Sequence, residues 1–263
     1  NKGGNVNIYM TGGNVNGGIY GGSNASGTIS GNVTMKILGG QVDSITDAGV
    51  VKLANIHGGG YGESTIVTKN VDIILGASNQ DNNGIEVYGD IYGGSALGQV
   101  NCSLISDGNG NITGYQYTAN THTNVTLHKG IINGSLYGGA LGQKNGVNGA
   151  ISDITANVYG PVTVKVYGGS VRKTSIEGSG GVYGANNLYG TPLRSVTVDI
   201  YGTDPAPAEG QYALYSVYGG GNKADYIYND HPKVTVHNQS NSIEYVYGGG
   251  NAAAVEATDI IIW

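Results

Sequence analysis

The chain has no phenylalanine, one cysteine, five prolines and few charges, since charged residues are 11% of its 263 positions against about 25% in typical soluble proteins. Cys102 has no second cysteine to pair with, so no internal disulfide can form. The net charge of −6 argues against a nucleic-acid partner, because phosphate neutralisation needs clustered Lys and Arg. No run of about 18 apolar residues exists, and we expect no membrane insertion by this segment.

The chain also lacks helical periodicity, and its 49 glycines disfavour helices. A short strand pattern recurs instead, in which two apolar residues flank a polar one. Such alternation with β-branched residues is typical of a strand with one buried face. The eight copies are Val6-Asn7-Ile8, Val33-Thr34-Met35, Val71-Asp72-Ile73, Val125-Thr126-Leu127, Val162-Thr163-Val164, Val196-Thr197-Val198, Val234-Thr235-Val236 and Thr258-Asp259-Ile260.

A second pattern joins an aromatic residue to a glycine block. It occurs seven times, at Tyr20-Gly21, His57-Gly58, Tyr92-Gly93, Tyr137-Gly138, Tyr183-Gly184, Tyr218-Gly219 and Tyr247-Gly248. Glycine accepts a positive φ without a Cβ clash, so we expect these seven glycines to form a sharp structural corner. Asparagine tolerates the left-handed conformation next best. We therefore expect Asn24, Asn186, Asn222 and Asn251, which follow the corner, to adopt it and to hydrogen-bond along the corner.

Repeats with a period of tens of residues indicate a solenoid. The Val-Thr-Val strands begin 24 to 54 residues apart, too far for a meander with hairpin turns of about two to five residues. We predict an all-β fold, a single-stranded right-handed parallel β-helix (β-solenoid) of about seven or eight coils. It is expected to span 1–263 as one domain and to be a fragment of a longer protein. Loop insertions are predicted at 43–53, 79–83, 102–120, 143–157, 172–180 and 203–211.

Aligning the Val-Thr-Val copies predicts which outward side chains stack. One column reads Asn7, Thr34, Asp72, Thr126, Thr163, Thr197, Thr235 and Asp259, and the next reads Tyr9, Lys36, Ile74, His128, Lys165, Asp199, His237 and Ile261. In the second column Lys165, Asp199 and His237 lie on successive coils, so that opposite charges meet. Such exposed pairs stabilise by at most about 1 kcal/mol each. In the strand before the last glycine block, the same alternation of inward and outward side chains would bury Glu244, so we expect a β-bulge there.

Blocks such as Val217-Tyr218-Gly219-Gly220-Gly221-Asn222, alternating with Val-Thr-Val strands, resemble the glycine-rich β-helical repeats of large bacterial cell-surface, adhesin-like proteins. They resemble autotransporter passenger domains more loosely. The resemblance covers Val6 to Ile262. It implies a non-catalytic bacterial module, extracellular or on the cell surface, that displays loops, spaces other domains, or binds a glycan or an extracellular protein.

The tyrosine stripe is the main candidate surface of this sequence. Its members are Tyr20, Tyr92, Tyr137, Tyr183, Tyr218 and Tyr247, with His57 in the remaining position. A row of rings could stack on sugars or on another filament. The alternative is packing between coils beneath loops, which stabilises the fold and binds nothing. The outward threonine column is interpreted as a solvated strand face, because charges interrupt any flat array that could order water or ice.

The second hypothesis is a carbohydrate-active β-helix enzyme, a polysaccharide lyase or hydrolase. Cleaving a polysaccharide needs two carboxyl groups about 5 to 9.5 Å apart. Asp72 and Asp199 lie three coils apart, about 14 Å at the strand spacing. Loop acids remain as candidates, namely Asp81, Glu86, Asp90, Asp225 and Asp230. No cofactor or metal site is expected, because His128 and His237 are also three coils apart and no cysteine cluster exists. The third hypothesis is a self-assembling filament, since strand edges at the end of the solenoid favour stacking.

Overall fold

The computed structural model describes residues 4–47, 50–77, 84–228, 231–237 and 242–263. These residues form strands and no helix, which confirms the all-β class. Within them, accordingly, no helix offers the length and apolar character needed to cross a membrane. The predicted insertion at 79–83 lies outside the described residues.

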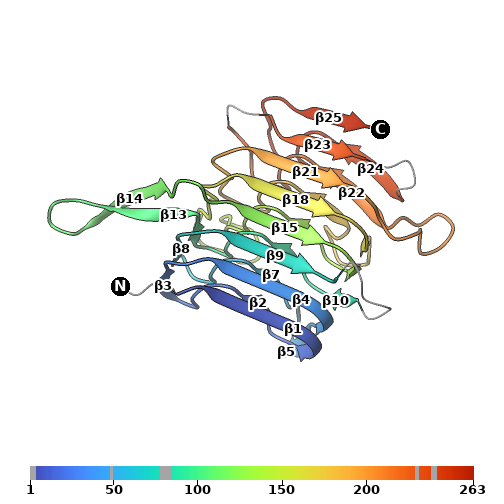
Figure 1. The fold of residues 1–263 in the computed structure, drawn as a ribbon, viewed down its shortest axis with the longest axis horizontal. Helices are drawn as coiled ribbons and strands as arrows, with labels where there is room; N and C mark the ends of the chain where they lie inside the picture. Colours follow the sequence, from blue (N-terminus) through green and yellow to red (C-terminus); the bar gives the residue numbers. More distant parts are fainter. Residues whose placement is uncertain (1–3, 48–49, 78–83, 229–230, 238–241) are drawn as a thin grey trace.

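Eight strands form the ladder that we call the front ladder. They are β1 (Val6–Val15), β4 (Val33–Val42), β9 (Val71–Leu75), β15 (Thr123–Leu127), β18 (Val162–Val166), β21 (Val196–Ile200), β23 (Lys233–Val236) and β25 (Asp259–Ile262). Each pairs in parallel with the next strand in this order. Figure 1 shows them as a stack from β1 in blue to β25 in red. Parallel neighbours require a crossover, so the chain leaves the ladder and returns between each pair.

The crossovers carry further parallel ladders. The tyrosine ladder contains β2 (Ile19–Tyr20), β7 (Ile56–His57), β11 (Ile91–Tyr92), β17 (Leu136–Tyr137), β20 (Gly181–Tyr183), β22 (Leu214–Tyr218) and β24 (Ile243–Tyr247). A third parallel ladder lies between the front ladder and the tyrosine ladder along the chain. It consists of the C-terminal ends of β1 and β4, followed by β10 (Ile85–Val87), β16 (Gly130–Ile132) and β19 (Ser170–Val171), each paired with the next. A separate sheet joins β3 (Ser26–Ile29), β8 (Ser64–Val67) and β12 (Gln99–Val100).

The apolar residues of the front ladder form the core, as the alternation predicts. In β9 the side chains of Val71, Ile73 and Leu75 are buried, while Asp72 and Ile74 between them are half-buried. The same alternation recurs in β15, β18 and β21. The inward valines, isoleucines and leucines of all ladders belong to one continuous cluster. Each such side chain contributes about 1.5–3 kcal/mol by leaving water.

The predicted register is wrong for two of the eight front strands. In β15 the residue paired with Asp72 is Asn124 and not Thr126, and in β23 the residue paired with Thr197 is Lys233 and not Thr235. Both slips are of two residues. Side chains alternate with a period of two, so a two-residue slip leaves every apolar residue on the correct face. The pairing of Lys165 with Asp199 is confirmed.

Two predicted loops are β-hairpins. β13 (Cys102–Ser106) pairs antiparallel with β14 (Ile112–Tyr117), and β5 (Ile45–Asp47) pairs antiparallel with β6 (Val50–Lys52). The side chain of Cys102, the first residue of the predicted 102–120 insertion, does not lie in a polar environment but is fully buried at the base of the β13–β14 hairpin. Burial raises the pKa of its thiol to about 12. The cysteine is therefore neutral at physiological pH and packs as a small apolar residue.

The corner glycines are required for a reason other than the predicted one. None of the seven has a positive φ, and neither do Asn24, Asn186, Asn222 and Asn251. Instead, a Cβ on Gly93 would overlap the carbonyl oxygen of Gly138 in the next strand and lie 2.7 Å from Cγ2 of Thr123. The same overlap with the next glycine carbonyl recurs at Gly21, Gly58, Gly138, Gly184 and Gly219, and Gly248 meets Thr258. Close approach of backbones, not backbone strain, selects glycine here.

The expected bulge at Glu244 is also absent, because β22 and β24 pair without any register shift. β22 pairs with β19 through Leu214 and with β20 through 216–218. The strand therefore passes from one ladder to the next, and β24 follows the same bend beside it. This bend leaves Glu244 half-buried beside Tyr215 instead of in the core.

Gly93→Ala tests the close approach. We expect it to lose about 3 kcal/mol of unfolding free energy, since the new methyl group overfills a packed interior. Urea unfolding followed by circular dichroism measures the change. Gly249→Ala is the matched control, because a Cβ there meets nothing within 4 Å and we expect a change below about 0.5 kcal/mol. Equal losses at the two positions would contradict the explanation.

Candidate functional site

Seven aromatic rings form a continuous stack along the tyrosine ladder. Successive centroids in the series Tyr20, His57, Tyr92, Tyr137, Tyr183, Tyr218 and Tyr247 lie 4.6–5.0 Å apart, with planes within 10° of parallel. The spacing equals the distance between paired strands, about 4.7–4.9 Å. The five rings between Tyr20 and Tyr247 therefore have both faces against neighbouring rings. A sugar that binds by stacking needs a free ring face, which the middle of this column does not have.

The segments that follow the glycine blocks pack over the rings. Their backbones form a second ladder, in which Leu141 N donates to Ser95 O, Asn187 N to Ala140 O, Asn222 N to Asn186 O and Asn251 N to Gly221 O, at 2.9–3.1 Å. Tyr92, Tyr137 and Tyr183 are at most 3% exposed as a result. Of the predicted stripe, Tyr20 is half-buried beneath the edge of Tyr61, and Tyr247 is 43% exposed.

Asparagine amides connect this cover, in part as predicted. Asn251 Nδ2 donates to Asn222 Oδ1 at 2.9 Å, and Asn222 Nδ2 donates to Asn187 Oδ1 at 2.9 Å. Asn187 Nδ2 in turn donates to the hydroxyl of Tyr92 at 2.8 Å. Asn187 thus takes the place predicted for Asn186, whose Oδ1 accepts from Ala140 N instead. The structure brings Asn222 and Asn251 together, and they hold the cover of the stack.

Two titratable groups lie beside the rings, the buried His57 and the half-buried Asp90. Burial lowers the pKa of His57 to about 3. Burial raises the pKa of the Asp90 carboxyl, against opposing hydrogen bonds from the Tyr92 hydroxyl and from Ser135 N, both at 2.8 Å. His57 is enclosed by protein and serves packing, whereas Asp90 is half-buried and its carboxylate is held by these two hydrogen bonds.

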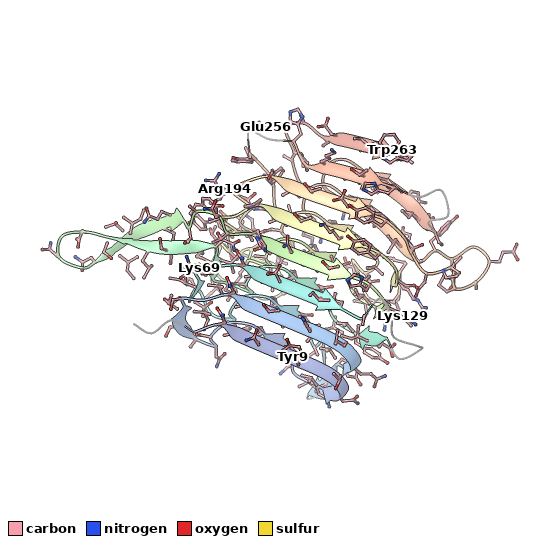
Figure 2. The ribbon with its side chains drawn as sticks, in the orientation of Figure 1. Tyr9, Lys69, Lys129, Arg194, Glu256 and Trp263 are labelled. Carbon is pink, nitrogen blue, oxygen red and sulfur yellow. The ribbon has the colours of Figure 1, made fainter. Side chains whose placement is uncertain are left out.

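A second aromatic stack, at the ends of the front strands, was not predicted. His128, Tyr167, Tyr201 and His237 stack with centroids 5.1, 4.7 and 4.2 Å apart. Trp263 occupies the equivalent position after the last front strand, because its backbone N–H donates to Val236 O just as the backbone N–H of His237 donates to Ile200 O. Tyr167 is 44% and Trp263 67% exposed, and Trp263 is labelled in Figure 2. The sequence alignment missed this column, because the register that it predicted placed His128 beside Lys165 and His237 beside Asp199.

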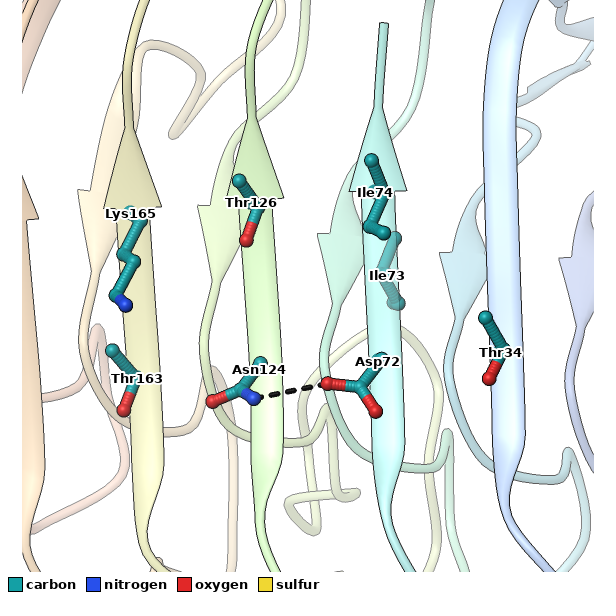
Figure 3. Close-up of a pocket in the computed structure, with 8 residues that line it drawn as sticks. All are labelled: Thr34, Asp72, Ile73, Ile74, Asn124, Thr126, Thr163 and Lys165. Carbon is teal, nitrogen blue, oxygen red and sulfur yellow. Dashed lines mark hydrogen bonds between the residues drawn. The ribbon is translucent and has the colours of Figure 1, made fainter. Parts of the chain in front are cut away.

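A shallow hollow of about 260 Å³ lies on the outer face of the front ladder. Figure 3 shows Asp72 on β9 and Lys165 on β18, with Asn124 and Thr126 between them. Asp72 Oδ1 accepts from Asn124 Nδ2 at 2.9 Å and lies 3.2 Å from His122 Nε2. Asp72 is the one carboxylate in the described lining, so this hollow does not supply the pair that glycoside cleavage requires.

The other candidate acids have structural partners. Glu86 accepts from Gln41 and Asn133, and Asp225 accepts from the backbone N–H of Ala254. Asp81 and Asp230 lie outside the described residues. His237 Nε2 lies 3.1 Å from Asp199 Oδ1. Across the part of the chain that the structure describes, no three His, Cys, Asp or Glu side chains are grouped closely enough to hold a metal ion.

No model of a known protein family, no curated protein and no solved structure matches this chain.

His57→Tyr tests the buried histidine. Because the folded pKa lies below the usual 6.5, the unfolded chain binds an extra proton between about pH 6.5 and 3, and the wild type loses stability as the pH falls through this window. A tyrosine, as elsewhere in the column, removes this loss. From pH 7 to pH 5 we expect the wild type to lose about 2 kcal/mol more than His57→Tyr.

Urea unfolding at both pH values gives the comparison, and Asp90 is common to both proteins. His128→Tyr makes the same exchange in a half-buried ring stack and controls for the exchange itself. Parallel pH profiles for the wild type and His57→Tyr would contradict the prediction.

Proposed function

We propose that the chain is a right-handed parallel β-helix of about seven or eight coils that acts as a non-catalytic module of a bacterial surface or secreted protein. Its role is to hold insertions at fixed spacing and to bind a glycan or an extracellular protein through them. Support for the solenoid comes from the parallel ladders, in which equivalent strands pair in sequence order. Support for the location comes from the resemblance of the Tyr-Gly-Gly repeats to adhesin-like proteins.

One observation carries the binding role: the hairpin of β13 and β14 extends away from the stack of strands (Figure 1). It exposes three apolar side chains, with Leu104 36%, Ile105 41% and Ile112 60% exposed. Hydrogen bonds hold its tip, since the Asp107 carboxylate accepts from the backbone N–H groups of Asn109 and Asn111. A preorganised projection on a rigid scaffold is a common way to build a binding element, since little ordering is left to occur on binding.

The intact chain, incubated with a glycan array and a panel of extracellular matrix proteins, tests the proposal. We expect at least one specific partner, with affinity reduced about tenfold or more by Ile112→Asp, because a charge replaces an apolar contact worth about 1.4 kcal/mol or more. Ile151→Asp is the matched control, as Ile151 is 92% exposed on another insertion. A chain without any partner, or one that releases reducing ends from a polysaccharide, would overturn the proposal.

Self-association is a second candidate function, favoured by the exposed edge of β25. Within the described structure this strand pairs only with β23, and it leaves Ile260 43% and Ile262 65% exposed. An unpaired edge with apolar side chains is a template for another strand. The opposite edge of the stack is β1, on which Tyr9 is exposed (Figure 2).

Sedimentation velocity at several protein concentrations tests this candidate. We expect the sedimentation coefficient to rise with concentration, and Ile262→Lys to abolish the rise because a charge blocks apolar edge pairing. Ile151→Lys should leave it unchanged. A concentration-independent monomer would exclude the filament.

A further inference from the structure

A hollow of about 320 Å³ lies between two insertions that the repeat does not require. One wall is Arg172 and Lys173, at the start of the 172–180 insertion after β19. The other is the insertion between β21 and β22, shown in orange in Figure 1, which contributes Gln211 and Tyr212. The volume is at the small end of the range for ligand sites, about 300–1,000 Å³, which suits a single small unit.

The hollow holds two cations without carboxylate partners. No described carboxylate lies within ion-pair distance of Arg172 or Lys173. Nε of Arg172 is buried and has no hydrogen-bond partner among the described residues. An unsatisfied buried donor of a charged group is costly, and an anionic ligand in the hollow would stabilise the guanidinium charge. These two cations stand out in a chain of net charge −6.

The aromatic side chains here differ from those of the two stacks. Tyr212 is 38% exposed and makes no ring contact with any aromatic side chain that the structure describes, so no other ring covers its exposed part. Tyr215 meets Tyr245 edge-on, at 5.6 Å and 85°, and Nζ of Lys173 lies 5.3 Å from the centre of the Tyr215 ring. Glu244 completes the lining with an acceptor. The bend of β22 and β24 that keeps Glu244 out of the core is what places it here.

We infer that this hollow binds an acidic sugar residue, a pyranose ring that carries a carboxylate. The carboxylate accepts hydrogen bonds from Arg172, which suits planar bidentate recognition, and Lys173 adds charge. The apolar face of the sugar packs on Tyr212, and sugar hydroxyls donate to Glu244. An acidic peptide would satisfy the cations but has no apolar sugar face to pack against the exposed part of Tyr212. The inference rests on the proposed glycan-binding role and names the class of glycan.

Titration of the intact chain with glucuronic acid, sialic acid and glucose, followed by saturation-transfer NMR, tests the site. We expect the acidic sugars to bind at least tenfold more tightly than glucose, and Arg172→Gln to weaken their binding at least tenfold. Tyr212→Ala should weaken it severalfold. Lys36→Gln is the matched control and should change the affinity less than twofold, because Lys36 also lies over a tyrosine ring, that of Tyr9 at 5.6 Å, but outside the hollow.

Equal affinity for glucose, or no effect of Arg172→Gln, would overturn the inference, as would tighter binding of poly-glutamate than of either acidic sugar. If Arg172→Gln does not fold, the exposed Lys173→Gln provides the test and should weaken binding at least threefold. Array partners that are neutral glycans and do not depend on Arg172 would overturn the acidic-sugar site while leaving the adhesion role intact. Absence of both sugar binding and array partners would overturn both.

Discussion

The spacing of about 4.8 Å between parallel strands is the constraint on which the rest of this structure depends. Parallel pairing in equivalent register places each residue above its counterpart, so like side chains stack on like. Valines and tyrosines tolerate this, and ring planes stacked at 4.6–5.0 Å match it closely. Stacked like charges repel, which is consistent with a chain that has only 11% charged residues. The glycine blocks follow from the same spacing, because at Gly93 and its equivalents the next backbone leaves no room for a Cβ.

This constraint separates folding from binding within the chain. The tyrosine ladder is the most regular feature of the sequence, yet its rings present their faces to one another and are covered by the segments that hold Asn187, Asn222 and Asn251. The regular repeat of tyrosines therefore indicates packing between neighbouring strands. Other exposed side chains lie where the repeat is interrupted, on the hairpin of β13 and β14 and around Arg172 and Tyr212.

The period-two pattern was sufficient to predict the all-β class, the parallel pairing and most of the register. It could not detect the slips in β15 and β23, because a shift of two residues keeps Val125 and Val234 on the buried face. The correct register needed a second signal, the aromatic residue after each strand at His128, Tyr167, Tyr201 and His237. The role of the corner glycines was also beyond the pattern. A positive φ and a close backbone approach both select glycine, and only the neighbouring strand distinguishes them.

The hollow proposed to bind an acidic sugar could not be predicted from the sequence, because its residues come from insertions that are not part of the repeat. Arg172 and Tyr212 are separated by 40 residues in the sequence and meet because β19 and β22 are paired at Val171 and Leu214. Extra residues in a surface loop cost little closure entropy, about 0.6 kcal/mol for each doubling of length. An insertion can therefore change without disturbing the parallel ladders. Specificity in such a protein is expected to reside in pairs of insertions on adjacent levels, whose separation is set by the strand spacing and whose chemistry is independent of it.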